Sequence, residues 1–221
     1  MIGIPLHGDG KEAFWSSLQQ LIFATAKGGV DTAVMKRKSP YLAHNRNIIV
    51  RQARNWPGAT HLLFLDADME VPSDTLLRLL AADKDMVVAN AYLKSEQTKP
   101  LVDVLDKTDN FMSIHIPPED GQLHRVHRAG TGVCLFKLHI FDTIPFPWFF
   151  QDYSDPPKNW PGKEEDLIEG KIMVGEDTRF FMVALGLGFK LYCDFSIEIG
   201  HIGDKVYTWK DYEAQHEEDK T

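Results

Sequence analysis

The sequence of 221 residues is 43% hydrophobic and 25% charged, with a net charge of −8 at pH 7, as is typical of a globular domain. This negative net charge argues against nonspecific binding to nucleic acid, because such binding depends on positive side chains that neutralise phosphates. It does not exclude a local basic groove. No apolar run approaches the roughly 20 residues that span a bilayer, and the segment MIGIPLHGDG lacks the features of a signal peptide. Cys134 and Cys193 stand in apolar stretches, which predicts buried free thiols in a reducing, cytoplasmic location.

The first part of the chain alternates between apolar runs and segments with helical spacing. One helix is expected to stop at Gly28, the next to be capped by Ser39 with Pro40 in its first turn, and the third to be capped by Ser73. The expected strands are residues 1–6, 32–37, 61–65 and 86–92, and the expected helices are residues 11–29, 39–58 and 72–83. Such alternation predicts an α/β fold with a largely parallel sheet between helices.

After about residue 95 the alternation loosens, which divides one domain into two halves. Two short apolar segments, 100–106 and 111–116, are expected to pair, and residues 149–170 are expected to form a loop rich in Pro, Gly and charge. Further strands are expected at residues 130–137 and 189–194, helices at 138–144 and 176–188, and a charged, solvated, partly helical tail at 210–221.

Two aspartates follow directly on the apolar run of residues 61–65. Asp66 and Asp68 point the same way on extended chain, and ligands of open α/β sheets bind beyond the carboxyl ends of strands. Neighbouring carboxylates repel each other unless a cation lies near them, and oxygen ligands suit Mg²⁺ or Mn²⁺. A divalent metal is therefore the economical explanation. The alternative is that Asp66 caps a turn and Asp68 faces solvent.

Arg46 lies on one helical stripe with Leu42, Ile49 and Ala53, so it faces the sheet. A guanidinium facing the interior needs an anionic partner. The sequence leaves three possibilities open: a nucleotide phosphate, a carboxylate at the edge of the sheet, or a purely structural ion pair.

Six segments in order along most of the chain carry a family resemblance: IPLHGDG, HNRNIIVRQA, LLFLDADMEVPSDTL, AGTGVCLFKLHIFDTI, GEDTRFFMVALGLGFKLYCD and IEIGHIG. In this order and spacing the chain resembles the metal-dependent glycosyltransferases with the A-type (GT-A) nucleotide-sugar-binding fold, particularly the family-two-like group. The resemblance implies a single-domain, Rossmann-like α/β fold with a mostly parallel central sheet, helices on both faces and a small acceptor-side β element. It also implies that residues 1–95 form the nucleotide-sugar-binding half and residues 96–209 the acceptor and catalytic half.

The resemblance further implies a role for each residue that matches the family's motifs. The implied ligands of Mn²⁺ or Mg²⁺ are Asp66, Asp68 and His201, with Asp66 also placed to touch the ribose or to reach the metal through water. The implied catalytic residues are Asp177, as the base of an inverting reaction, and Glu176 as second choice. The implied donor-binding residues are Pro5, His7, Arg46, Asn47, Asp66 and Gly132, with Asn45 and Gly130 beside them. The histidines could instead be structural or exposed, and the acidic pair could simply cap a helix.

The implied donor is a nucleotide-diphosphate sugar, with UDP-sugar favoured and GDP-sugar second. The acceptor hydroxyl stays open among a glycan, a protein, a lipid-linked sugar and a modified nucleobase, as do both stereochemical outcomes. Three rivals remain: a sugar-nucleotide nucleotidyltransferase, a catalytically silent nucleotide-sugar or glycan-binding module, and an aspartate-nucleophile phosphatase. The phosphatase motif fits least, because Glu70 stands where it has Thr or Val.

Overall fold

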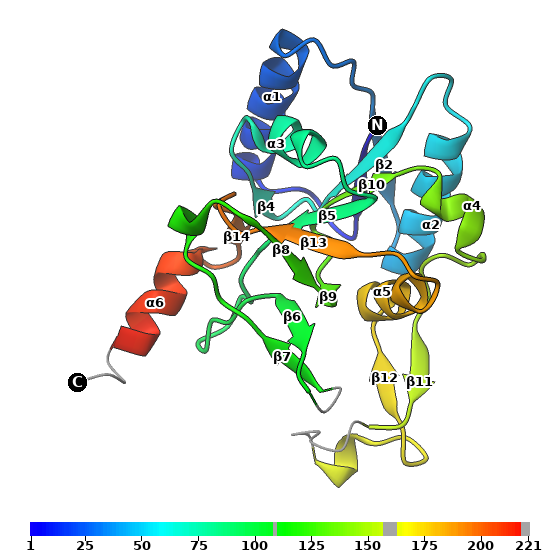
Figure 1. Cartoon of the computed structure of the whole chain (residues 1–221), viewed down its shortest axis with the longest axis vertical. Helices are drawn as coiled ribbons and strands as arrows, with labels where there is room; N and C mark the ends of the chain where they lie inside the picture. Colours follow the sequence, from blue (N-terminus) through cyan, green and yellow to red (C-terminus); the bar gives the residue numbers. More distant parts are fainter. Residues whose placement is uncertain (108–109, 157–162, 218–221) are drawn as a thin grey trace.

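A seven-stranded mixed sheet forms the centre of the computed structural model, which describes residues 1–107, 110–156 and 163–217 (Figure 1). The strand order is β2 (Val34–Lys38), β1 (Ile2–Leu6), β3 (His61–Leu65), β10 (Val133–Lys137), β5 (Met86–Ala89), β13 (Leu191–Asp194) and β8 (Leu123–Val126). Strands β10 and β8 run antiparallel to their neighbours, and the others run in one direction. The predicted mostly parallel α/β sheet is therefore confirmed.

Helices cover both faces of this sheet, as predicted. Helices α1 (Glu12–Lys27) and α3 (Thr75–Ala81) lie on one face, and α2 (Leu42–Arg54), α4 (Ile140–Thr143) and α5 (Glu176–Gly186) lie on the other (Figure 1). Strand β3 shows why its sequence is continuously apolar: Leu63 packs into the core beneath α1 and α3, whereas Phe64 packs into the core beneath α2 and α5. Both side chains are fully buried, so neither face of the strand tolerates polar residues.

Strand β10 positions the carboxyl end of β3. It comes from the second half of the chain but lies between β3 and β5, antiparallel to both. Its register pairs Val133 with Leu65, and the backbone N–H of Asp66 donates to the carbonyl of Gly132 over 2.8 Å. The two halves of the chain therefore meet where the aspartates follow β3.

Three small sheets and a C-terminal helix complete the fold. One sheet contains β7 (Phe111–Ser113), β6 (Val102–Leu105) and β9 (Arg128–Ala129), which confirms the predicted pairing of residues 100–106 with 111–116. The others are β15 (Val206–Tyr207), β14 (Gly200–Ile202) and β4 (Met69–Glu70), and the pair β11 (Asp152–Ser154) and β12 (Ile172–Val174). Helix α6 (Trp209–Glu217) follows, and two 3₁₀ turns span Pro118–Asp120 and Glu164–Asp166.

Two helix starts differ from the prediction. Helix α2 begins at Leu42, because the Ser39 hydroxyl donates to the Asn45 side chain over 2.7 Å and Tyr41 stays extended at φ −105° and ψ 94°. Helix α3 begins at Thr75, with Asp74 rather than Ser73 at its N-cap. In both cases a residue type that is typical of a cap lies in the turn before the helix instead.

Two segments that were expected to be a loop and a solvated tail make more contacts with the rest of the fold than expected. Residues 152–154, inside the predicted loop 149–170, form strand β11 against β12; residues 157–162 of that loop lie outside the described part of the chain. The tail at 210–221 was predicted to be solvated and partly helical; its residues up to Glu217 belong to helix α6, as predicted, but Gln215 bonds to the backbone of Glu96 and Thr98, and residues 218–221 lie outside the described part of the chain. Both cysteines are buried free thiols, as predicted. Among the residues that the structure describes, no helix is long and apolar enough to cross a bilayer.

Candidate active site

Two cavities meet at Asp66 and Asp68, which leave β3 in a tight turn closed by a 3.0 Å bond from the Met69 N–H to the Asp66 carbonyl. The first cavity, of about 350 Å³, is lined by side chains that include Pro5, His7, Leu42, Asp66, Asp68 and Lys94. The second, of about 200 Å³, is lined by residues that include Asp66, Asp68, Gly130, Gly132, Asp177 and His201. A ligand that bridges the two cavities would therefore pass both aspartates.

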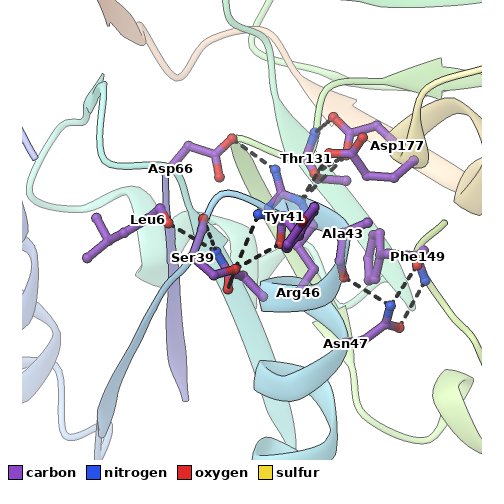
Figure 2. Close-up of polar contacts among 12 residues, drawn as sticks. Leu6, Ser39, Tyr41, Ala43, Arg46, Asn47, Asp66, Thr131, Phe149 and Asp177 are labelled. Atoms are coloured by element: carbon purple, nitrogen blue, oxygen red, sulfur yellow. Dashed lines mark hydrogen bonds and ion pairs between the residues drawn. The ribbon is translucent and has the colours of Figure 1, made fainter. Parts of the chain in front are cut away.

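Arg46 lies behind the first aspartate at the centre of a buried ion cluster (Figure 2). Its side chain is 1% exposed, and its Nη2 lies 3.0 Å from Asp66 Oδ2. Its Nε lies 3.7 Å from Asp177 Oδ1 and 3.9 Å from Glu176 Oε1, and its guanidinium stands 5.1 Å from the centre of the Phe64 ring. Of the partners that the sequence left open, the structure places carboxylates against Arg46.

The charges of this cluster do not balance. One guanidinium faces three carboxylates, and burial raises the pKa of both Asp66 and Glu176, with Asp177 adding to the rise in each case. Asp66 Oδ1 and Arg46 Nη1 are buried and have no hydrogen-bond partner among the described residues. A buried polar atom without a partner is costly, and because Asp66 lines both cavities, a ligand or water there can supply a partner for its Oδ1, whereas Arg46 lines neither cavity.

The second aspartate has a different environment. Asp68 Oδ2 receives the Lys94 ammonium at 2.5 Å and faces His201 Nε2 at 3.4 Å. Although desolvation opposes ionisation, the hydrogen bonds from His201 and Lys94 lower the pKa of Asp68 to about 2. Asp68 is therefore a carboxylate at any physiological pH.

His201 reaches this position because β14 pairs with β4, which sets His201 opposite Met69. Its Nδ1 lies 2.7 Å from the Tyr92 carbonyl oxygen, which can only accept, so Nδ1 carries a proton. Nε2 then either donates to Asp68 as an imidazolium or offers a lone pair to a cation. An imidazole oriented through Nδ1–H by a backbone carbonyl is the usual arrangement of a metal-ligating histidine.

The predicted metal ligands are only partly gathered. Within residues 1–107, 110–156 and 163–217, no group of three or more His, Cys, Asp or Glu side chains is placed to hold a metal ion. Asp68 and His201 lie together, whereas the Oδ2 of Asp66 is held by Arg46. One carboxylate and one oriented imidazole fit a Mn²⁺ or Mg²⁺ ion that takes its other ligands from substrate phosphates and water.

Asp177 and Glu176 occupy the first turn of α5, and they differ in access. Asp177 lines the second cavity together with Asp68 and His201, whereas Glu176 contributes nothing to that lining. The Thr131 N–H donates to Asp177 Oδ2 over 3.1 Å, and the Thr131 hydroxyl donates to Oδ1 (Figure 2). Thr131 is fully buried and fixes the Asp177 carboxylate. Thr131 could not be predicted as a site residue, because its only signal in the sequence is its place between Gly130 and Gly132.

The predicted donor-binding residues fall into two groups. Pro5 and His7 line the first cavity beside the aspartates. Gly132 lines the second cavity, but a Cβ there would lie 2.5 Å from Met69 Cε and 3.4 Å from Asp66 Oδ2. Its missing side chain therefore makes room for Met69 and Asp66, and room for the donor sugar beside it stays a prediction.

The two asparagines beside Arg46 serve the fold. The Asn47 side chain donates to the Phe149 carbonyl over 2.6 Å and accepts from the Phe149 N–H over 3.1 Å (Figure 2). Asn45 donates to the Leu6 carbonyl over 3.0 Å. Both amides are engaged with backbone, and Asn47 clamps α2 to the segment before β11, whereas its contact with the donor stays a prediction.

Comparison with known proteins bears on the fold. The crystal structure of A197 from STIV is similar at 19% identity with a TM-score of 0.57, over 92% of this chain and 85% of that one. The structure of GalNAc-T7 with UDP, GalNAc and Mn²⁺ is similar at 14% identity with a TM-score of 0.54, over 98% of this chain and 47% of that one. No protein-family profile and no curated protein sequence matches. At such identities the likeness establishes architecture alone, and it confirms the single-domain GT-A-like fold that the sequence predicts.

Proposed function

We propose that this protein is a glycosyltransferase that moves a sugar from a nucleotide-diphosphate sugar to an acceptor hydroxyl with the help of a divalent metal. One observation carries the proposal: two cavities meet at Asp66 and Asp68, with His201 beside Asp68 and Asp177 in the lining of the second cavity. That arrangement offers one compartment for a nucleotide and one for a sugar and its acceptor. In this proposal residues 1–95 supply most of the nucleotide side, and residues 96–209 supply most of the acceptor side, in a family-two-like enzyme.

The donor side is the first cavity. Pro5 and His7 would face the nucleoside, and Asp68 and His201 would hold Mn²⁺ or Mg²⁺ against the diphosphate. The metal supplies electrostatic stabilisation of the departing diphosphate. Asp66, fixed by Arg46, would contact the ribose or metal-bound water through its unpartnered Oδ1. GalNAc-T7, which was crystallised with UDP and Mn²⁺, supports UDP and Mn²⁺ as the first pair to test, with GDP second.

The acceptor side is the second cavity. Asp177 would accept the proton of the acceptor hydroxyl. As the proton leaves, the oxygen of that hydroxyl attacks the anomeric carbon of the donor sugar, and the bond from this carbon to the diphosphate breaks. Thr131 would keep the Asp177 carboxylate in place. Glu176 touches Arg46 but not this cavity, so Asp177 is preferred as the base.

Nucleotide binding tests the proposal directly. UDP at 100 times its Kd, with Mn²⁺ present, should stabilise the folded protein by about 2.7 kcal/mol, which a thermal-shift titration detects. Omitting Mn²⁺ should remove most of the shift. A shift with GDP alone would change the donor assignment, and no shift with either nucleotide would contradict the proposed function.

A further inference from the structure

Lys94 holds a position that the proposed reaction does not yet explain. Its ammonium lies 2.5 Å from Asp68 Oδ2, the same oxygen that His201 Nε2 approaches to 3.4 Å. Its stem lies so close to Gly203 that a Cβ there would approach Lys94 Cδ to 3.1 Å. Lys94 also lines the first cavity. The ammonium is thus packed at the oxygen that the proposed metal needs.

The backbone around Lys94 is tied down, although the side chain is long and flexible. We call residues 93–98 the Lys94 loop. The Leu93 N–H donates to the Lys99 carbonyl over 2.9 Å, and Gln215 of α6 accepts from the Thr98 N–H over 2.9 Å. The Gln215 amide also donates to the Glu96 carbonyl over 2.6 Å. Any movement of the charge is therefore expected to come from the four-carbon lysine stem rather than from the loop.

A divalent cation and an ammonium group cannot share one carboxylate oxygen without strong repulsion. The side chains of Lys94 and Asp68 are 33% and 34% exposed, and an ion pair with that much access to water is weak enough to exchange. A diphosphate in the first cavity would offer Lys94 new anionic oxygens on the side where it already lies. Charge-assisted bonds to phosphate are stronger than an exposed lysine–carboxylate pair.

We propose that Lys94 is a donor-binding residue that exchanges partners: it neutralises Asp68 until metal and donor arrive, and then binds the diphosphate of the donor. This inference rests on the proposed function, because it needs a metal on Asp68 and a diphosphate in the first cavity. It makes Lys94 a competitor of the metal alone and a helper of the metal–nucleotide complex. Those two roles predict effects of opposite sign when the charge is removed.

Lys94→Met separates the two roles. Calorimetric titration of Mn²⁺ alone should give about two- to fivefold tighter binding than in the wild-type protein, since the competing ion pair is lost. Titration of UDP at saturating Mn²⁺ should give about tenfold or more weaker binding, because a charge-assisted bond to phosphate is lost. Lys94→Arg keeps the charge and should retain most of the UDP affinity.

Lys137→Met is the matched control. It removes another lysine–aspartate pair, to Asp83 at 2.6 Å, at the opposite end of β10 from the site, and should change neither titration. If wild-type protein binds UDP with Mn²⁺ but Lys94→Met shifts both affinities in the same direction, or shifts neither, the exchange is wrong while the proposed function stands. If wild-type protein binds no nucleotide with Mn²⁺, the proposed function fails and the exchange fails with it.

Discussion

The two aspartates at the end of β3 are held by cations of opposite character. In the Arg46 cluster, made of Arg46, Asp66, Thr131, Glu176 and Asp177, the cation is buried and touches several carboxylates. In the Asp68 cluster, made of Asp68, Lys94 and His201, the cation is a third exposed and contacts one carboxylate oxygen. Arginine stays charged and rigid when buried, whereas lysine is a flexible point charge. The first cluster therefore suits fixed geometry, and the second suits exchange with a ligand.

The largest expected effect tests whether the Arg46 cluster takes part in catalysis. Asp177→Asn leaves one oxygen to accept from Thr131 but removes the proton acceptor, so sugar transfer should fall about 10²–10⁴-fold. UDP binding with Mn²⁺ should stay close to wild type, because Asp177 faces the acceptor side. Steady-state transfer or slow donor hydrolysis measures the first quantity, and calorimetry the second.

Glu176→Gln is the paired variant for that prediction. It changes the neighbouring carboxylate that does not line the cavity, and the expected loss of transfer is smaller. Full activity in Asp177→Asn together with a large loss in Glu176→Gln would move the base to Glu176. Full activity in both would leave the proposed inverting mechanism without a base.

The next largest effect tests how much the Arg46 cluster contributes to the stability of the fold. Arg46→Met should lower the free energy of unfolding by about 3–5 kcal/mol at pH 7, because it leaves buried carboxylates without their cation. Urea denaturation measures this change. The deficit should shrink as the pH falls, since Asp66 and Glu176, whose pKa values burial already raises, are neutral once protonated.

A matched arginine elsewhere sharpens the contrast. Arg54 pairs with Asp142 and is 36% exposed, so Arg54→Met should cost only about 0–1 kcal/mol. Equal costs for the two variants would mean that the Arg46 cluster is not more tightly held than an ordinary surface pair.

The sequence predicted the Arg46 cluster better than the Asp68 cluster, because local sequence patterns point to Arg46 and Asp66 but not to Lys94. Helical spacing alone turned Arg46 towards the sheet, and the end of an apolar run located Asp66. Lys94 is a lone lysine in a polar loop, where no local pattern distinguishes it from a solvated side chain. Its partner Asp68 also faces His201, which β14 brings opposite Met69 from more than a hundred residues away along the chain.

The order of the strands in the sheet could not be predicted either, because it too depends on contacts between residues that are far apart in the sequence. The apolar pattern predicted β10 as a strand, but its antiparallel place between β3 and β5 depends on pairing across the whole chain. That pairing is also what brings Thr131 to Asp177. The misplaced helix start at Ser39 had a smaller cause, a short side-chain bond to Asn45 that competes with capping, whereas at Ser73 the helix simply begins one residue later, after Asp74.

The smallest expected effect concerns how the contribution of the Asp68 cluster to the free energy of unfolding changes with pH. The folded-state pKa of Asp68, about 2, lies below its ordinary value, so its ionised form contributes stability above about pH 4 that is lost as the pH falls towards 2. Because the pair is about one third exposed, solvent screening reduces the contribution to about 1 kcal/mol. Asp68→Asn should therefore destabilise the fold by about that amount at pH 6 and by almost nothing at pH 2, as measured by urea denaturation across the range.

Asp9→Asn provides the comparison, since Asp9 pairs with Lys38 over 2.7 Å at a fully open position and should contribute much less. The sign of the pH dependence is the same in the two clusters. Losing Arg46 should hurt least in acid because its carboxylates then lose their charge, and losing the Asp68 charge should also hurt least in acid because the wild-type advantage has gone. The difference is in size: a cost of several kcal/mol for Asp68→Asn at pH 6 would mean that Asp68 is held as firmly as Asp66. An ion pair that firm would not give way to a metal, so the result would count against the exchange of Lys94.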